Sequence, residues 1–148
     1  MSIKISLRFK TKFDSELLKH GLQVRVIRLM ASVCFNTPIG WTASFKAVVD
    51  TGNPVTILPE IVHRHIHHRI LHPDFISLFG VGRGQVLAHL GEVEMAFVGR
   101  KQISPPLRIK AYLLQDNSLP VLIGCEDALT ELRLFSDYTR RRAYAEFR

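Results

Sequence analysis

Short apolar segments, many with alternating polar residues, recur along the chain and are separated by residues that favour turns. Side chains in a β-strand point alternately to opposite faces, so this spacing predicts strands. Glycine, proline and asparagine between the segments supply the turns. The pattern therefore predicts an all-β fold. The segments with strand character are 22–29, 42–50, 55–59, 86–98, 107–114 and 119–124.

Two other segments predict short helices. Segment 59–71 begins with Pro59, which is favoured at the first helical position, and Glu60, which suits the positive end of a helix. Pro73 ends this segment. In the second segment, 125–134, apolar residues recur at helical spacing. We therefore expect one or two short helices in a chain that is otherwise strand and turn.

The two ends of the chain predict further strands. Residues 1–20 are interpreted as an N-terminal leader, with one strand at 3–9 and a short helical turn at 13–20. At the other end, residues 132–138 and 142–147 are typical of the two strands of a hairpin. The main domain is expected to follow the leader.

Length and composition suit a chain with an apolar core. It has 148 residues, of which 47% are apolar.

Charged residues such as Arg25, Arg28 and Lys46 interrupt its apolar runs, so none reaches the ~20 residues of a membrane helix. The N-terminus lacks the apolar stretch of a signal peptide. Cys34 and Cys125 are far apart, which favours a reducing compartment. We therefore expect a cytoplasmic protein without a membrane partner.

The chain is basic, with a formal net charge of +7 and a pI near 9.9. Nucleic-acid binding requires cations that gather on one face. Here the cations are scattered along the sequence, apart from the arginine run 140–142. The composition therefore favours a solvated basic surface and no nucleic-acid partner.

The first candidate for chemistry is Asp50, which follows the apolar residues 45–49 and precedes Thr51 and Gly52. Gly52 permits a tight turn, and a second apolar strand begins at about residue 55. An aspartate in such a turn usually accepts a hydrogen bond from its own backbone. A purely structural role is therefore the alternative to a catalytic one.

A second candidate is the glycine-rich segment that contains Gly80, Gly82 and Gly84 between two strand-like runs. It predicts a hairpin whose tip closes over a groove and offers backbone donors to an extended ligand. The alternative is an ordinary glycine-rich turn. A strand is expected to follow, which argues against a dinucleotide-binding loop, because that loop opens a helix.

A third segment, 119–138, contains an apolar strand that ends at Gly124 and continues into a short helix and a further strand. In this order, the motifs "VVDTGNPVTIL", "FGVGRGQV" and "VLIGCEDAL" resemble those of the retropepsin-like (retroviral-type) aspartic peptidases. The resemblance covers residues 21–148. It implies a closed β-barrel or sandwich with a flap hairpin, a homodimer, a peptide or protein substrate, and neither cofactor nor metal.

The resemblance also implies roles for individual residues. Asp50 carries the chemistry, while Thr51 and Gly52 shape the catalytic loop. The implied substrate-binding residues are Asn53, Val81, Gly82, Arg83 and Gly84.

Hydrolysis by carboxylates needs two of them at one site, because two close like charges do not both ionise and one remains an acid. The chain has no second Asp-Thr-Gly or Asp-Ser-Gly, since Asp14 and Asp137 lack the glycine. A two-fold homodimer brings Asp50 from each subunit together, because an isologous interface repeats every residue. The expected function is therefore an aspartic endopeptidase in which an Asp50 pair activates water.

One position departs from the family pattern. After the glycine the family commonly has Ala, Ser or Thr, whereas this chain has Asn53 followed by Pro54. Asn53 is bulkier and crowds the groove beside the carboxylate. The alternative function is therefore a catalytically inactive module of the same fold that dimerises or binds peptides.

The histidines form a competing cluster. Two pairs of them lie four residues apart, a spacing that binds zinc when the segment is helical. A solvated basic helix face is favoured over this third hypothesis, a metal-binding domain. The histidines are His63, His65, His67, His68 and His72, and the nearby carboxylates are Glu60 and Asp74.

Overall fold

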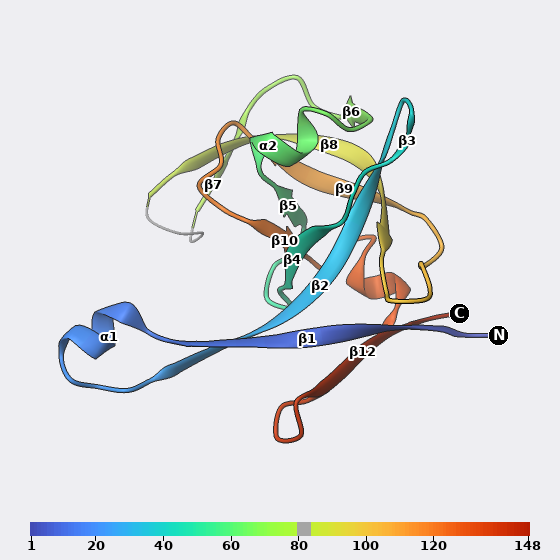
Figure 1. Ribbon diagram of the computed structural model, residues 1–148. Coiled ribbons are helices and arrows are strands. Elements are labelled where there is room, and N and C mark those ends of the chain that lie inside the picture. Colours follow the sequence, from blue (N-terminus) through green and yellow to red (C-terminus); the bar gives the residue numbers. More distant parts are fainter. Residues whose placement is uncertain (80–83) are drawn as a thin grey trace.

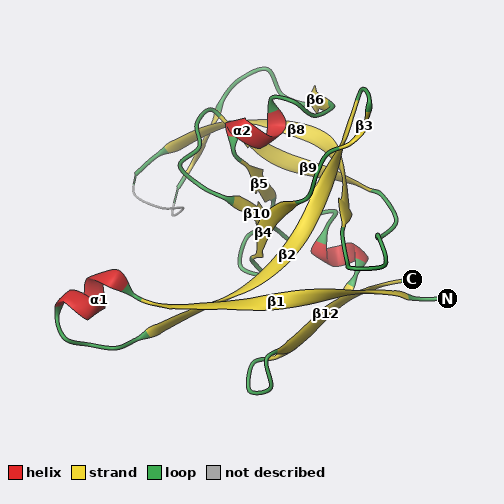
Figure 2. Ribbon diagram, in the orientation of Figure 1, coloured by secondary structure: helices red, strands yellow, loops and turns green. Residues whose placement is uncertain are grey.

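The computed structural model describes residues 1–79 and 84–148, and its strands form one 12-stranded sheet (Figure 1 and Figure 2). The predicted all-β class is confirmed, since the helices are few and short. The strands are β1 (Ile3–Phe13), β2 (Arg25–Thr37), β3 (Gly40–Trp41), β4 (Phe45–Val49), β5 (Thr56–Leu58), β6 (His68–Ile70), β7 (Ile76–Leu78), β8 (Val86–Phe97), β9 (Leu107–Leu114), β10 (Val121–Ile123), β11 (Arg133–Asp137) and β12 (Arg142–Phe147). The helices are α1 (Ser15–Lys19), α2 (Glu60–His63) and the 3₁₀ helix η1 (Leu129–Glu131).

The strand order is β11-β12-β1-β2-β4-β10-β5-β9-β8-β6, while β3 pairs with β2 and β7 with β8. Most neighbours are antiparallel, but β4–β10 and β5–β9 are parallel. An additional pairing joins β2 to β8. The pairings therefore run from β2 through β4, β10, β5, β9 and β8 and return to β2. The finer retropepsin-like architecture and the homodimer stay predictions.

The segment predicted as a leader is part of this sheet. Residues 3–7 of β1 pair with β12, and residues 8–13 pair with β2. Ile5 and Leu7 lie in the main core, because alternate side chains of the strand point inward. The strand and the helical turn predicted within residues 1–20 are both confirmed. In Figure 1, β1 and β2 form an arm that projects from the rest of the molecule and carries α1 at its tip.

The predicted helix at 59–71 is wrong beyond its first turn. Helix α2 ends at His63, and the chain then forms β6, which pairs with β8. Ile66, between the two elements, is buried in the main core. Pairing with β8 requires an extended backbone, and this tertiary contact overrides the local helical pattern. The second predicted helix is likewise reduced to the short η1.

Two predicted hairpins are confirmed. Strands β11 and β12 form the C-terminal hairpin, with Asp137 opposite Arg142 at its turn. Strands β7 and β8 pair on either side of the glycine-rich segment, with Leu78 opposite Val86, while residues 80–83 between them lie outside the described residues. This second hairpin is where the sequence predicts the flap.

Candidate functional site

Asp50 lies directly after β4, where the chain leaves the sheet. Its N–H donates to the Ile123 carbonyl oxygen of β10 at 3.0 Å, which extends the parallel pairing of β4 and β10. Its Oδ1 accepts the N–H of Gly52 at 3.1 Å, the turn contact that the sequence suggested. Among the described residues, Oδ2 has no hydrogen-bond partner. Asp50 is half-buried while Thr51 and Gly52 are exposed, so a fixed carboxylate borders an accessible turn.

The turn after β10 packs directly against this loop. A Cβ on Gly124 would lie 2.6 Å from the Val55 carbonyl carbon, an approach that only glycine allows. The N–H of the next residue, Cys125, donates to the Asn53 carbonyl oxygen at 2.9 Å. The Asp50 loop is therefore clamped by backbone contacts from β10 and its turn.

A buried hydroxyl completes the clamp. Thr56 is fully buried, and its Oγ1 accepts the Gly124 N–H at 3.1 Å. We expect Thr56→Val to lower the free energy of unfolding by about 2 kcal/mol, because it leaves a buried N–H without an acceptor while keeping the side-chain shape. Urea denaturation measures this loss.

The matched control for this change is Thr130→Val at an exposed position. It should stay within about 0.5 kcal/mol of the unsubstituted protein. Equal stability of the two variants would show that the Thr56 hydroxyl does not support the loop.

An apolar cluster connects the Asp50 strand with the β7–β8 hairpin. Val48, two residues before Asp50, packs against this cluster. The cluster also includes the paired hairpin residues Leu78 and Val86. The base of the hairpin therefore rests on the strands that present Asp50. The buried members of this hairpin cluster are Ile57, Leu78, Val86, Ala88, Leu114 and Leu122.

The structure brings four of the predicted site residues together in one turn and describes one residue of the predicted flap tip. The tip residue Gly84 has φ of +87°, a conformation that favours glycine. The residues of the turn are Asp50, Thr51, Gly52 and Asn53. Three predicted residues lie outside the described residues: Val81, Gly82 and Arg83.

Sequence reasoning missed several neighbours of the loop. Val48 and Leu122 join the hairpin cluster from β4 and β10, and only the parallel pairing of these strands brings them together. The Sγ of Cys125 donates to the Thr51 carbonyl oxygen at 3.4 Å. The apolar-apolar-glycine run before Cys125 predicts the strand β10. No local pattern, however, reveals that Cys125 contacts the Asp50 loop.

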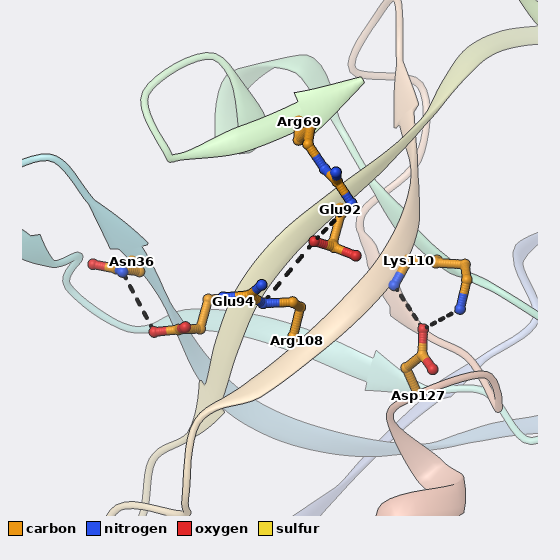
Figure 3. A network of polar contacts seen from close by, with 7 residues as sticks. All are labelled: Asn36, Arg69, Glu92, Glu94, Arg108, Lys110 and Asp127. Atoms are coloured by element: carbon orange, nitrogen blue, oxygen red, sulfur yellow. Dashed lines mark hydrogen bonds and ion pairs between the residues drawn. The ribbon is translucent and has the colours of Figure 1, made fainter. Parts of the chain in front are cut away.

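Asp127 ties the turn after β10 to β9. Figure 3 shows its Oδ2 accepting both the N–H of Lys110 at 2.9 Å and the Lys110 Nζ at 3.0 Å. Burial acts to raise the pKa of Asp127, but the hydrogen bonds from Lys110 outweigh it and hold this pKa below its ordinary value. The charged form is therefore favoured, and it anchors the turn that supports the Asp50 loop.

The histidine segment does not have the predicted helical spacing, since its second half is the strand β6. The His63 Nε2 lies 2.7 Å from the Leu114 carbonyl oxygen, to which it donates, while its Nδ1 is buried without a described partner. The described residues contain no group of three or more His, Cys, Asp or Glu side chains that could hold a metal ion. The predicted helix is thus wrong beyond its first turn, and His63 at the end of α2 is directed inward. The solvent exposure is as predicted for the other four histidines, which are His65, His67, His68 and His72.

Burial is the main cause that lowers the pKa of His63, and the nearby His68 adds to it, against the opposing hydrogen bond to Leu114. The unfolded chain, with a histidine pKa of about 6.5, then binds more protons than the folded one in mild acid. Stability contributed by neutral His63 is therefore present above about pH 6.5 and is lost as the pH falls toward its folded pKa.

As the pH is lowered from about 7 to about 5, the free energy of unfolding should fall less in His63→Gln, which keeps a side-chain donor, than in the unsubstituted protein. Urea denaturation at each pH measures the slope. His20→Gln, at an exposed position, is the control and should keep the original slope. An unchanged slope in His63→Gln would contradict the assignment.

Comparison with known proteins assigns no family to the chain. No protein-family model matches it, and no curated protein matches its sequence. Within residues 1–79 and 84–148, none of the helices is long and apolar enough to cross a membrane. A function for the chain is therefore inferred from the geometry of the Asp50 loop.

Proposed function

We propose that the protein is an aspartic endopeptidase, active as a homodimer in which each subunit contributes one Asp50 carboxylate to a single site. The observation that carries the proposal is the Asp50 loop. Its carboxylate is held by the Gly52 N–H, and its backbone is clamped to Ile123 and by the turn at Gly124. Acid–base catalysis requires this kind of fixed carboxylate beside an accessible surface.

In the proposed reaction the two carboxylates share one proton, since like charges about 3 Å apart do not both ionise. The ionised carboxylate takes a proton from water, and the water oxygen attacks the peptide carbonyl carbon. The protonated carboxylate gives its proton to the carbonyl oxygen. The tetrahedral intermediate then collapses and the C–N bond breaks: the carboxyl that took the proton from water gives it to the leaving amine, and the other carboxylate takes a proton from a hydroxyl of the intermediate, which restores the shared proton.

The surroundings of the loop support an extended peptide as substrate. The β7–β8 hairpin rests on the hairpin cluster, to which Val48 and Leu122 contribute next to the Asp50 loop. A peptide that crosses the loop beside the hairpin would meet the exposed apolar side chains of Phe79 and Leu87, which belong to the hairpin. We therefore expect apolar residues to be preferred beside the cleaved bond.

The dimer is part of the proposal because the loop offers one carboxylate per chain. Thr51 and Gly52 are exposed at its tip, which leaves room for a second copy to approach. In a two-fold arrangement the same loop meets itself, so no further catalytic residue is needed.

The test is cleavage of a mixed peptide library between about pH 4 and about pH 7, with products identified by mass spectrometry. A peptide that carries a hydroxyl in place of the attacked carbonyl mimics the transition state and should block cleavage. Sedimentation measured in parallel should show a dimer, and the activity should fall with dilution as the dimer dissociates.

Two outcomes would contradict the proposal. Peptides that bind without being cleaved would support the inactive module instead, with Asn53 and Pro54 the first residues to examine. A protein that stays monomeric at the concentrations used, and yet cleaves, would remove the two-subunit site.

A further inference from the structure

A cavity with a basic lining lies between the first half of β1 and the segment that follows β8, and its volume is about 780 Å³. Lys4 and Arg8 line it from β1, and Arg100 and Lys101 line it from the opposite side. No Asp or Glu is among the described residues of the lining. Cations from residues 4–8 and 100–101, far apart in the sequence, are thus gathered around one concave surface.

These four charges are not neutralised locally. Among the described ion pairs, none includes Lys4, Arg8, Arg100 or Lys101. The nearest carboxylate in the sheet register is Glu146, opposite Lys4. Glu146 is also opposite Arg133 on its other side, so this row of the sheet still carries a net positive charge.

The basic row continues along the arm. Lys10 follows Arg8 on the same face of β1, because side chains two residues apart point the same way. Its cross-strand partner is Arg28 of β2. A positive stripe therefore extends from the cavity along the arm formed by β1 and β2, whose course is shown in Figure 1.

Neutral donors lie among the cations. Ser6 and Ser32 contribute hydroxyl groups to the lining, and Gln102 contributes an amide. Together with arginine and lysine, these are the groups that contact phosphate oxygens in protein–nucleic acid complexes.

Two aromatic rings lie beside the cavity on the β12 side. Tyr144 is opposite Ser6 in the register, and its ring is stacked on Phe135 with centroids 5.0 Å apart and an interplanar angle of 16°. The Lys4 Nζ lies 4.9 Å from the centre of the Tyr144 ring. Phe135 remains 46% exposed, so a ring face or edge is accessible to a ligand.

We propose that this surface binds single-stranded nucleic acid, with the phosphates along the cavity and the stripe and a base stacked on the exposed Phe135, whose ring Tyr144 supports from behind. A positive groove bordered by stacking side chains is the combination that single strands require, because each unpaired base presents a flat face. An acidic peptide would use the charges but not the rings. A membrane surface would not enter a concave cavity.

The experiment uses the full chain and a fluorescently labelled single-stranded RNA about 12 nucleotides long, with binding followed by anisotropy from about 50 to about 200 mM salt. The four cations of the cavity alone predict a slope of log K against log salt of about −3, and contacts with the stripe should make it steeper. Absence of binding at the lowest salt concentration would overturn the proposal.

Two variants separate the charges from the rings. The double variant Arg100→Gln/Lys101→Gln should weaken binding roughly 10- to 30-fold at about 0.1 M salt and reduce the slope by about 1.4. Phe135→Leu should weaken binding about fivefold at an unchanged slope, because it removes stacking and no charge.

The matched control is Arg69→Gln/Arg108→Gln, which removes the same charge from the Glu92 ion pairs on another part of the sheet (Figure 3). It should leave the affinity and the slope close to those of the unsubstituted protein. Equal weakening by both double variants would mean that net charge alone binds RNA, and would overturn the site. Tighter binding of a polyglutamate peptide or of anionic vesicles than of RNA would overturn the choice of ligand.

Discussion

Replacement of Asp50 by asparagine is expected to lower kcat/KM for peptide cleavage by about 10⁴-fold or more, because both acid–base groups of the dimer are lost at once. The fold should survive, since the asparagine Oδ1 can still accept the Gly52 N–H that Asp50 accepts at 3.1 Å. Cleavage of the best library peptide measures the loss. Thermal unfolding and sedimentation verify that the variant is folded and dimeric.

The control for this substitution is Asp14→Asn. Asp14 caps α1 by accepting the Leu17 N–H, a role that asparagine also fulfils. This variant should cleave at the original rate. Full activity in Asp50→Asn, or equal loss in both variants, would contradict the assignment of the chemistry to Asp50.

Mixtures of the two proteins test whether the site is shared. When equal amounts of unsubstituted and Asp50→Asn chains exchange freely, about one quarter of the dimers carry two aspartates. A shared site therefore predicts about one quarter of the original activity per total chain, whereas independent sites in each subunit predict about one half. The second result would contradict the dimeric mechanism even if Asp50 proved essential.

The sequence predicted the strands and the turn at Asp50 well because their signals are local. Alternating apolar residues mark β8 and β9, and Asp50-Thr51-Gly52 carries its own turn chemistry. The Asx contact between Asp50 and Gly52 spans only two residues. A pattern of this kind needs no knowledge of the rest of the fold.

The predictions that proved wrong were those that depend on contacts between segments distant in the sequence. β6 pairs with β8 more than twenty residues later, as in the contact of Arg69 with Glu92, and this pairing stops the predicted helix. β1 pairs with β12 at the opposite end of the chain, so a segment interpreted as a leader supplies Ile5 to the core. The gathering of cations around Lys4 and Arg100 has the same origin.

Replacement of Gly124 by alanine is expected to have the largest effect on stability, a loss of about 3 kcal/mol or more in the free energy of unfolding. The added Cβ would lie 2.6 Å from the Val55 carbonyl carbon, 2.8 Å from the Asn53 oxygen and 2.9 Å from the Thr56 nitrogen. All three are backbone atoms, which cannot move aside as a flexible side chain can. Urea denaturation of the variant measures the loss.

Gly52→Ala is the matched control, because its Cβ would meet only the Asp50 Oδ1, at an ordinary distance of 3.5 Å. Its free energy of unfolding should remain within about 0.5 kcal/mol of the original. Equal stability of the two alanine variants would mean that β10 can move away from the loop without loss. In that case the clamp at Gly124 would not fix the position of Asp50, and the structural basis of the proposed catalysis would fail even with the carboxylate intact.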